Sequence, residues 1–562
     1  MTHQTTAATG RMLEIVAEAT ADNLLTYTRD VSQWVRMSGS DDERKAFAVI
    51  EELVRGWGLD VQRAEPVCLT SWPVAASITL PGGETVTCIT HSFSGSTPGV
   101  TGELIDAGDG SPEAYTGLDL AGKIALVTDP ASPGKAVAAE PTGALAVIHV
   151  NPGETIKEMI VSPVWGSPTP ETIDLLPTLP HVSVNRASGD RLREAMAAGA
   201  GEVTVTTEVD TRWRPLPLLV ATIPAGDPDG SGDFVLLSGH VDSWHYGAID
   251  NGTADACALE TARVLAAHRD ELRRDVRVAF WSGHSHARYG TSAWYADEHW
   301  LELYEHCVAH VNIDMPGYKG ATDLTQAPLT AEAFGMAGEV IAAIGEQELA
   351  YHRMQRMGDQ SFWGAGVPSV FMNISAAGPG VTMEWYHTPL DTMDYIDPAL
   401  LERDGRILLG ATWRLASDEI LPLDQLAPAE EILAELRALD AVAGGAFNML
   451  GLLADAEGLV EAAGRLRDAR STANADAASL NDATKAASRA LMPVNYTSRG
   501  PFEQDLALPI PTLPGLQAVR ELVALPEGSP ERLTLETRLR RERNRLAHAL
   551  REARFAIEAA LF

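Results

Sequence analysis

Cysteine is scarce in this sequence. Cys68, Cys88, Cys257 and Cys307 are the only four in 562 residues, and no two of them form a CxxC pair. This spacing argues against a zinc ribbon and against a disulfide framework, so we expect reduced and mostly buried thiols. Apolar runs of membrane-spanning length and the charged-then-apolar pattern of a signal peptide are also absent. We therefore expect a cytoplasmic chain.

The sequence has few basic residues relative to acidic ones. The chain has 43 Lys and Arg against 77 Asp and Glu, which gives a formal net charge of −34. Such an excess of negative charge argues against nucleic acid or an anionic membrane as a partner. We expect a small molecule or a short peptide-like substrate instead.

The chain is too long for a single hydrophobic core, and its composition and expected secondary structure change along its length. Residues 1–89 begin with helices, and residues 90–212 are rich in short strands and turns. Residues 213–422 alternate strands with helices, as in an α/β core, and residues 423–562 are Ala- and Leu-rich and helical. The β-rich segment is either a wall or lid beside a site or plain structural padding. The C-terminal helices are expected to form a homodimer.

Three apolar runs of strand length organise the α/β segment. They cover residues 234–238, 276–281 and 308–313, and polar side chains follow each of them. Because sites in open α/β sheets form at the carboxyl ends of the strands, these polar side chains are expected to converge. The candidates for metal ligation are His240, Asp250, Asp314 and His387. Asp242 is placed to orient the ring of His240.

Specific motifs in this segment resemble those of the M28 metallopeptidases. The sequences HVDSW, GAIDNG, NID and YHTPLDT are similar to the motifs of the branch that includes glutamate carboxypeptidase and transferrin receptor. The resemblance covers nearly the whole chain. It implies an α/β fold with a mixed-sheet zinc-peptidase core, an inserted β-rich protease-associated domain and a helical C-terminal domain that dimerises.

The resemblance also implies a site with two zinc ions bridged by Asp250. His240 and Asp314 would complete the first metal site, and His387 with a Glu would complete the second. The family has a Glu-Glu pair after the strand that ends at Trp281, the first Glu being the general base and the second a metal ligand. This chain has His284 and Ser285 at those two positions.

The exchange of two carboxylates for imidazole and hydroxyl changes the expected chemistry. His284 can accept a proton near neutral pH, although nearby divalent ions oppose a positively charged ring. Ser285 is a weak ligand, so either His284 or His286 joins the metal site or a single ion binds at the first site. A nitrogen-richer site is compatible with Zn, Fe, Co, Ni or Cu.

Substrate contacts are predicted mainly from one loop. The sequence GDQSFWGAGVPS resembles the family's pocket-forming loop and would place Asp359, Phe362 and Trp363 near the site. Arg353 is a candidate for binding a substrate carboxylate, with surface exposure as the alternative. Tyr386, next to His387, could donate a hydrogen bond to an oxyanion.

Three functional interpretations stay open at this point. The first is a metal-dependent hydrolase of an amide or peptide-like bond, with attack by metal-bound water and with His284, Tyr386 and Asp242 as catalytic side chains. The second is a repurposed mononuclear metalloenzyme, either a lyase or a metal-dependent oxidoreductase. The third is a non-catalytic binding protein built on the same fold. Retention of five polar groups at strand ends argues against the third.

Overall fold

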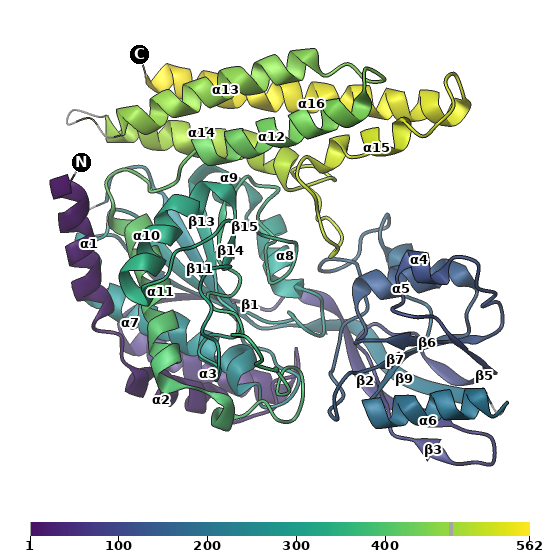
Figure 1. Cartoon of the computed structure of the whole chain (residues 1–562). Helices are drawn as coiled ribbons and strands as arrows, with labels where there is room; N and C mark the ends of the chain where they lie inside the picture. The colour runs from purple at the N-terminus through teal and green to yellow at the C-terminus, as the bar shows by residue number, and fades with distance from the viewer. Residues whose placement is uncertain (1, 200, 227, 471, 473–475, 562) are drawn as a thin grey trace.

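The computed structural model describes residues 2–199, 201–226, 228–470, 472 and 476–561. Figure 1 shows three parts: an α/β core, a β-rich part to its right and a layer of long helices above. Each part has its own cluster of buried apolar side chains. The fold class expected from the sequence is confirmed.

The α/β core is built on a six-stranded mixed sheet. In their order across the sheet the strands are β1 (Asp60–Ala64), β10 (Leu218–Ile223), β12 (Asp275–Trp281), β11 (Phe234–His240), β13 (Cys307–Asn312) and β16 (Ser369–Val370). β11, β12 and β13 are parallel neighbours, so their carboxyl ends lie at one edge. Every residue of β11 and β13 is buried, as expected for strands covered on both faces.

Helices cover both faces of this sheet. They are α1 (Thr2–Val16), α2 (Ala21–Val31), α3 (Asp41–Gly56), α7 (Ala254–Ala267), α8 (Gly290–Glu298), α9 (Trp300–His306), α10 (Phe334–Gly345) and α11 (Pro398–Ser417). A two-stranded sheet of β14 (Pro328–Leu329) and β15 (His352–Arg353) lies beside them. The Ser40 side chain accepts a hydrogen bond from the Glu43 N–H (3.1 Å) and caps α3.

The β-rich part is an eight-stranded sheet. Its strands, in order across the sheet, are β3 (Thr85–Val86), β2 (Val67–Thr79), β9 (Glu202–Pro215), β5 (Thr97–Asp106), β6 (Ile124–Thr128), β7 (Ala146–Val150), β8 (His181–Val184) and β4 (Ile89–Thr90). The helices α4 (Pro112–Tyr115), α5 (Pro133–Ala139) and α6 (Arg186–Ala197) accompany it. β2 belongs to this sheet although it lies within residues 1–89, because it pairs along its length with β9.

Long helices form the C-terminal part. They are α12 (Leu426–Ala443), α13 (Leu450–Ala469), α14 (Ala477–Asn495) and α16 (Pro530–Ala560), with the short α15 (Val519–Leu522). Their Leu and Ala side chains pack together as one cluster. Among the described residues, no helix is long and apolar enough to cross a membrane. All four cysteines are free thiols, three of them buried, which confirms the expectation from their spacing.

Candidate metal centre and active site

The carboxyl edge of the core sheet brings together the side chains predicted to bind metal. His240 is the last residue of β11, and Asp314 follows β13 by two residues. Asp250 lies in the turn that leads into α7, and His387 lies in the loop that precedes α11. All four are buried.

Backbone carbonyls orient the two histidines. The Nδ1 of His240 lies 2.9 Å from the carbonyl oxygen of Asp242, and the Nδ1 of His387 lies 2.7 Å from that of Glu158. A carbonyl oxygen only accepts, so each Nδ1 carries a hydrogen. Nε2 of the neutral ring therefore offers its lone pair to the site, which is the usual arrangement of metal-binding histidines.

His240, Asp250 and Asp314 are the side chains that would hold a first ion. The Nε2 of His240 lies 3.3 Å from the Oδ1 of Asp250 and 3.7 Å from the Oδ1 of Asp314. Ligands at about 2.0–2.1 Å from a tetrahedral zinc are about 3.3 Å from one another. The His240 Nε2 and the Asp314 Oδ1 are buried and make no hydrogen bond, so an ion would satisfy them. Although burial lowers the pKa of His240, the nearby carboxylates of Asp250 and Asp314 hold it well above its usual range in the metal-free chain.

The second ligand pair is less complete. The Nε2 of His387 lies 3.1 Å from the Oδ2 of Asp250, which would allow Asp250 to bridge two ions. Ser285 stands where a carboxylate would supply the third ligand, and its backbone N–H donates to Asp242 (2.9 Å). Two strong ligands are fewer than a zinc site normally has. These residues supply three candidate ligands for a first ion and two for a second.

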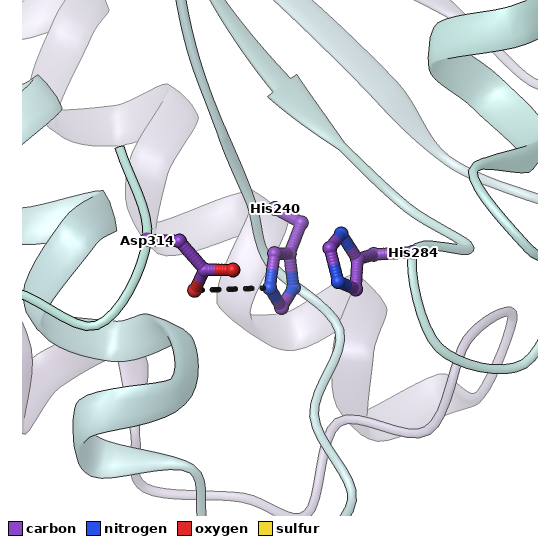
Figure 2. Close-up of side chains that lie close together, drawn as sticks. All are labelled: His240, His284 and Asp314. Carbon is purple, nitrogen blue, oxygen red and sulfur yellow. Dashed lines mark ion pairs between the residues drawn. The ribbon is translucent and has the colours of Figure 1, made fainter. Parts of the chain in front are cut away.

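His284 lies beside this ligand set and is paired with Asp359. Figure 2 shows the ring of His240 between Asp314 and His284, and a ligand atom of each lies within 4.8 Å of the others. The Nδ1 of His284 lies 2.8 Å from the Oδ2 of Asp359. Burial raises the pKa of Asp359, but the charge of His284 and its hydrogen bond outweigh burial, so that pKa lies below its usual range.

The stacking of His284 on His240 separates their roles. The ring centroids are 3.8 Å apart and the planes differ by 14°. Imidazole lone pairs lie in the ring plane, so two nearly parallel stacked rings do not direct their lone pairs at one ion. Stacked in this way, the two rings would not both direct a nitrogen at one ion, although His284, His240 and Asp314 are close enough together to be candidate ligands.

Asp242 lies beside His240, as the sequence suggested, with its Oδ1 3.7 Å from the His240 Nδ1, whereas His286 makes its hydrogen bond elsewhere. Asp242 is fully buried and accepts hydrogen bonds from the backbone N–H groups of His284 (3.1 Å) and Ser285 (2.9 Å) and from the Ser38 hydroxyl (2.7 Å). It holds the turn that carries His284, and the backbone carbonyl of Asp242 orients His240. The Nδ1 of His286 lies 3.1 Å from the Ser38 hydroxyl. Burial lowers the pKa of His286 to about 4.

The predicted substrate residues divide into two groups. Asp359 reaches the site through His284, and Tyr386 stacks on His387 with ring centroids 3.8 Å apart. Phe362 and Trp363 are fully buried core residues. Their apolar surface fills the interior and does not line a cavity at the ligand set.

Arg353 does not reach the site either. Its guanidinium pairs with Glu431 of α12 (2.8 Å) and donates to the carbonyl oxygen of Asn495 (2.7 Å). It therefore joins the core to the C-terminal helices. The prediction that Arg353 contacts substrate is not supported by this placement, because both ends of the guanidinium are already used.

Two contributors to the site escaped the sequence analysis. Asp391 accepts hydrogen bonds from the backbone N–H groups of Ile249 (2.8 Å) and Asp250 (3.0 Å), which positions the segment that carries the Asp250 carboxylate. Its place in the YHTPLDT motif was a usable signal. Glu158 comes from the β-rich part and uses its backbone carbonyl to hold His387, a role that no side-chain pattern reveals. The β-rich part thus forms one wall of the site.

Comparisons with known proteins agree with the geometry. Residues 219–412 match the profile of Peptidase family M28, and residues 100–192 match that of the PA domain. The chain is 26% identical over 247 residues to "Probable glutamate carboxypeptidase VP8" of Zea mays, covering 39% of this chain and 33% of the relative. The chain thus spans about a third of the length of this relative.

Aminopeptidases give longer matches. "Aminopeptidase YwaD" of Bacillus subtilis is 25% identical over 401 residues, covering 69% of this chain and 82% of the relative. The structure of BSAP, a zinc aminopeptidase from Bacillus subtilis, aligns with a TM-score of 0.56 and 22% identity over 71% of this chain and 96% of that chain. This likeness shows the fold. The resemblance inferred from the motifs is confirmed by these matches.

Proposed function

We propose that this chain, which contains an M28 peptidase domain with a PA domain beside it, is a metal-dependent hydrolase of an amide or peptide-like bond. One observation carries the proposal: the Nε2 of His240 lies 3.3 Å from a carboxylate oxygen of Asp250 and 3.7 Å from one of Asp314, next to a His284–Asp359 pair. Such a combination provides a place for a Lewis acid and a proton acceptor within one buried site.

The ligand set favours a transition metal, and the zinc aminopeptidase named among the structural relatives makes zinc the first candidate. His240, Asp250 and Asp314 would hold the ion. A divalent ion bound there supplies Lewis acidity that polarises a carbonyl group and activates water. We propose one tightly held ion for each chain, since the pair of His387 and Asp250 lacks a third strong ligand.

His284 is the proposed proton acceptor. Its Nδ1–H donates to Asp359, so Nε2 is left free to take a proton from the attacking water. The positive ring that results would be opposed by a nearby divalent ion, and the Asp359 carboxylate offsets that opposition. Ser292 donates to the other oxygen of Asp359 (2.7 Å) and keeps the carboxylate in place. The His–Asp pairing is the one that orients and stabilises a histidine base in hydrolases.

Tyr386 is the proposed donor to the oxyanion. Its ring is held against His387, and its phenol stays protonated because burial raises its pKa well above the usual range. A protonated phenol can donate a hydrogen bond to an oxygen that gains negative charge. Asp242 acts through the turn that it holds and not by touching substrate.

Elemental analysis of the purified chain tests the metal part of the proposal. One zinc per chain is expected, and a chain without metal after purification in zinc would contradict it. One iron, copper or nickel would favour a lyase or an oxidoreductase.

The activity is tested by the double variant His284→Glu with Ser285→Glu. Assayed with a panel of dipeptides and N-acyl amino acids, it should keep or increase hydrolysis, because Glu can serve as base and as ligand. Hydrolysis by the wild type that collapses in this variant would assign the imidazole a role that Glu cannot fill. Absence of hydrolysis in both proteins would refute the hydrolase.

The homodimer stays a prediction. Leu450 of α13 and Phe555 of α16 are large apolar side chains exposed on the C-terminal helices, at 72% and 62%. Sedimentation of the full chain, compared with a Phe555→Glu variant, would measure the oligomeric state. A wild-type chain that sediments as a monomer would contradict the prediction.

A further inference from the structure

His387 is held in place by a segment of the β-rich part, residues 157–161, which we call the strap. The Nδ1–H of His387 donates to the carbonyl oxygen of Glu158 (2.7 Å), and the N–H of Glu158 donates to the carbonyl oxygen of His387 (3.0 Å). His387 has a φ of +57°, in the left-handed region that is unfavourable for residues other than glycine. Such a residue keeps its conformation only where its surroundings fix it. The strap supplies two of the bonds that do so.

The position of the strap depends on the groups to which it is bonded. Residues 157–161 contain no helix and no strand, and Ile160 makes only an isolated bridge to Ser92. The N–H of Ser92 donates to the carbonyl oxygen of Met159 (3.1 Å), and the N–H of Val161 donates to that of Ser92 (3.1 Å). These contacts align the strap along Ser92. They leave the N–H of Met159, the residue next to Glu158, to find another acceptor.

The acceptor for Met159 is the ring of His91. The backbone nitrogen of Met159 lies 3.2 Å from the Nδ1 of His91, and the ring of His91 is fully buried. Because Nδ1 accepts, the hydrogen of the neutral ring is on Nε2, which donates to the hydroxyl of Ser183 in β8 (2.7 Å). The ring of His91 therefore connects a strand of the β-rich part to the strap.

Two more buried histidines lie behind His91. The ring centroids of His91 and His149 are 6.3 Å apart, and the Nε2 of His149 lies 3.1 Å from the Nδ1 of His181. The Nδ1 of His149 and the Nε2 of His181 are buried without a hydrogen-bond partner among the described residues. Burying such polar atoms costs free energy that an apolar side chain would not cost. His91 is the member of this cluster that uses both ring nitrogens, one of them for the strap.

We propose that His91 is a positioning residue for His387, and that it acts through Met159 and Glu158 of the strap. The inference rests on the proposed metal site, because it states how the β-rich part holds one of the candidate ligands. The strap fixes the orientation in which the Nε2 of His387 lies 3.1 Å from the Oδ2 of Asp250. His240 is held by the carbonyl oxygen of Asp242, within the core. His91 therefore affects the second ion position and leaves the first unchanged.

Two amide variants of His91 test this role in metal-free protein. In His91→Asn the amide oxygen takes the place of Nδ1 and can accept from Met159, whereas His91→Gln places its amide at the far end of the side chain, next to Ser183. Hydrogen exchange of the amides in residues 157–161 should be about 5- to 10-fold faster in His91→Gln than in wild type or His91→Asn, the effect of one lost hydrogen bond. Nitrogen-15 NMR of labelled histidines should show His387 as a single Nδ1–H form in wild type and His91→Asn, and as both tautomers in His91→Gln. The spectrum of His387→Asn assigns the signal.

A matched control and a zinc titration complete the design. His181→Gln is the same exchange at a buried histidine whose ring bonds to His149, and it should leave strap exchange and the tautomer of His387 as in wild type. The titration uses Ser285→Glu, which adds a third ligand to the second ion position. Adding His91→Gln to Ser285→Glu should weaken binding of the second zinc about 5- to 10-fold and leave the affinity for the first zinc unchanged. Adding His91→Asn should leave both affinities unchanged.

The outcomes separate this proposal from the hydrolase, because the exchange and NMR measurements need neither metal nor turnover. A single Nδ1–H form of His387 that His91→Gln loses and His91→Asn keeps would support the positioning role, also in a chain that hydrolyses no panel substrate. Wild-type strap exchange together with an unchanged tautomer of His387 in His91→Gln would overturn it. Equal effects of His91→Gln, His91→Asn and His181→Gln would overturn it as well, since the cluster would then act only through the stability of the β-rich part.

Discussion

Replacing Asp242 by Asn distinguishes a residue that supports the site from one that takes part in chemistry. Three donors converge on this carboxylate: the N–H groups of His284 and Ser285 and the hydroxyl of Ser38, at 2.7–3.1 Å. An amide has one acceptor oxygen, so its NH2 group must face at least one of these donors. Asp242→Asn therefore leaves a buried backbone N–H unsatisfied and weakens the bonds that remain.

The size of the effect follows from these contacts. An unsatisfied buried donor costs about 1–3 kcal/mol, and hydrogen bonds to a charged group are about twice as strong as neutral ones. The total loss is about 3 kcal/mol, which corresponds to a decrease of about 5–10 °C in the melting temperature of the core transition. The loss should be present in protein freed of metal, because the three donors belong to the protein.

Scanning calorimetry of metal-free protein measures this loss. Asp297→Asn is a matched control: burial raises the pKa of Asp297 to about 6, so its charge is unfavourable in the folded state and an amide should be neutral or slightly stabilising. A metal-free Asp242→Asn protein that melts at the wild-type temperature would refute this role. A loss of stability seen only with zinc present would indicate that Asp242 acts mainly through the ion.

Three other predictions concern metal content, acid stability and the interdomain contact. Ser285→Glu should raise the zinc content from one to two ions per chain in elemental analysis, because it adds the missing third ligand; a wild type with two ions would contradict this. Burial lowers the pKa of His91 to about 3 and that of His181 to about 4, below the ordinary value of 6.5. Well above pH 6.5 both rings are neutral in the folded and in the unfolded chain. As the pH falls from 6.5 toward 4, the unfolded chain binds protons that the folded chain does not, so the free energy of unfolding should fall by about 1.4 kcal/mol per pH unit for each histidine. Urea midpoints that stay constant from pH 7 to 5 would argue otherwise. Arg353→Met should lower the free energy of unfolding by about 1–3 kcal/mol, because its ion pair with Glu431 is lost, and KM should stay as in wild type. A raised KM would indicate that Arg353 contacts the substrate.

The sequence was informative wherever a residue's place along a strand decides its role. The predicted runs 234–238, 276–281 and 308–313 correspond to β11, β12 and β13 within one or two residues. A run of apolar residues that stops at a His or an Asp marks the end of a buried strand. Parallel strands place such ends at one edge, and His240 and Asp314 could be brought together on this basis alone.

Aromatic and basic residues of the substrate loop were less predictable. Phe362 and Trp363 occur in a loop motif that suggests a pocket, yet both are buried in the interior. Arg353 has the charge that a substrate carboxylate needs, but Glu431 lies in a segment far along the chain and takes that charge. Side-chain type does not reveal the partner, because the partner is chosen by packing.

Taken alone, the sequence determined the ligand types, their order and the exchange of a Glu-Glu pair for His284 and Ser285. Only the tertiary structure decided what His284 does. Its ring stacks on that of His240, and its Nδ1 is held by Asp359 from 75 positions away. The same turn buries the Nε of Arg288 without a hydrogen-bond acceptor among the described residues. Directions of lone pairs and donors depend on contacts between distant segments, and no local pattern encodes them.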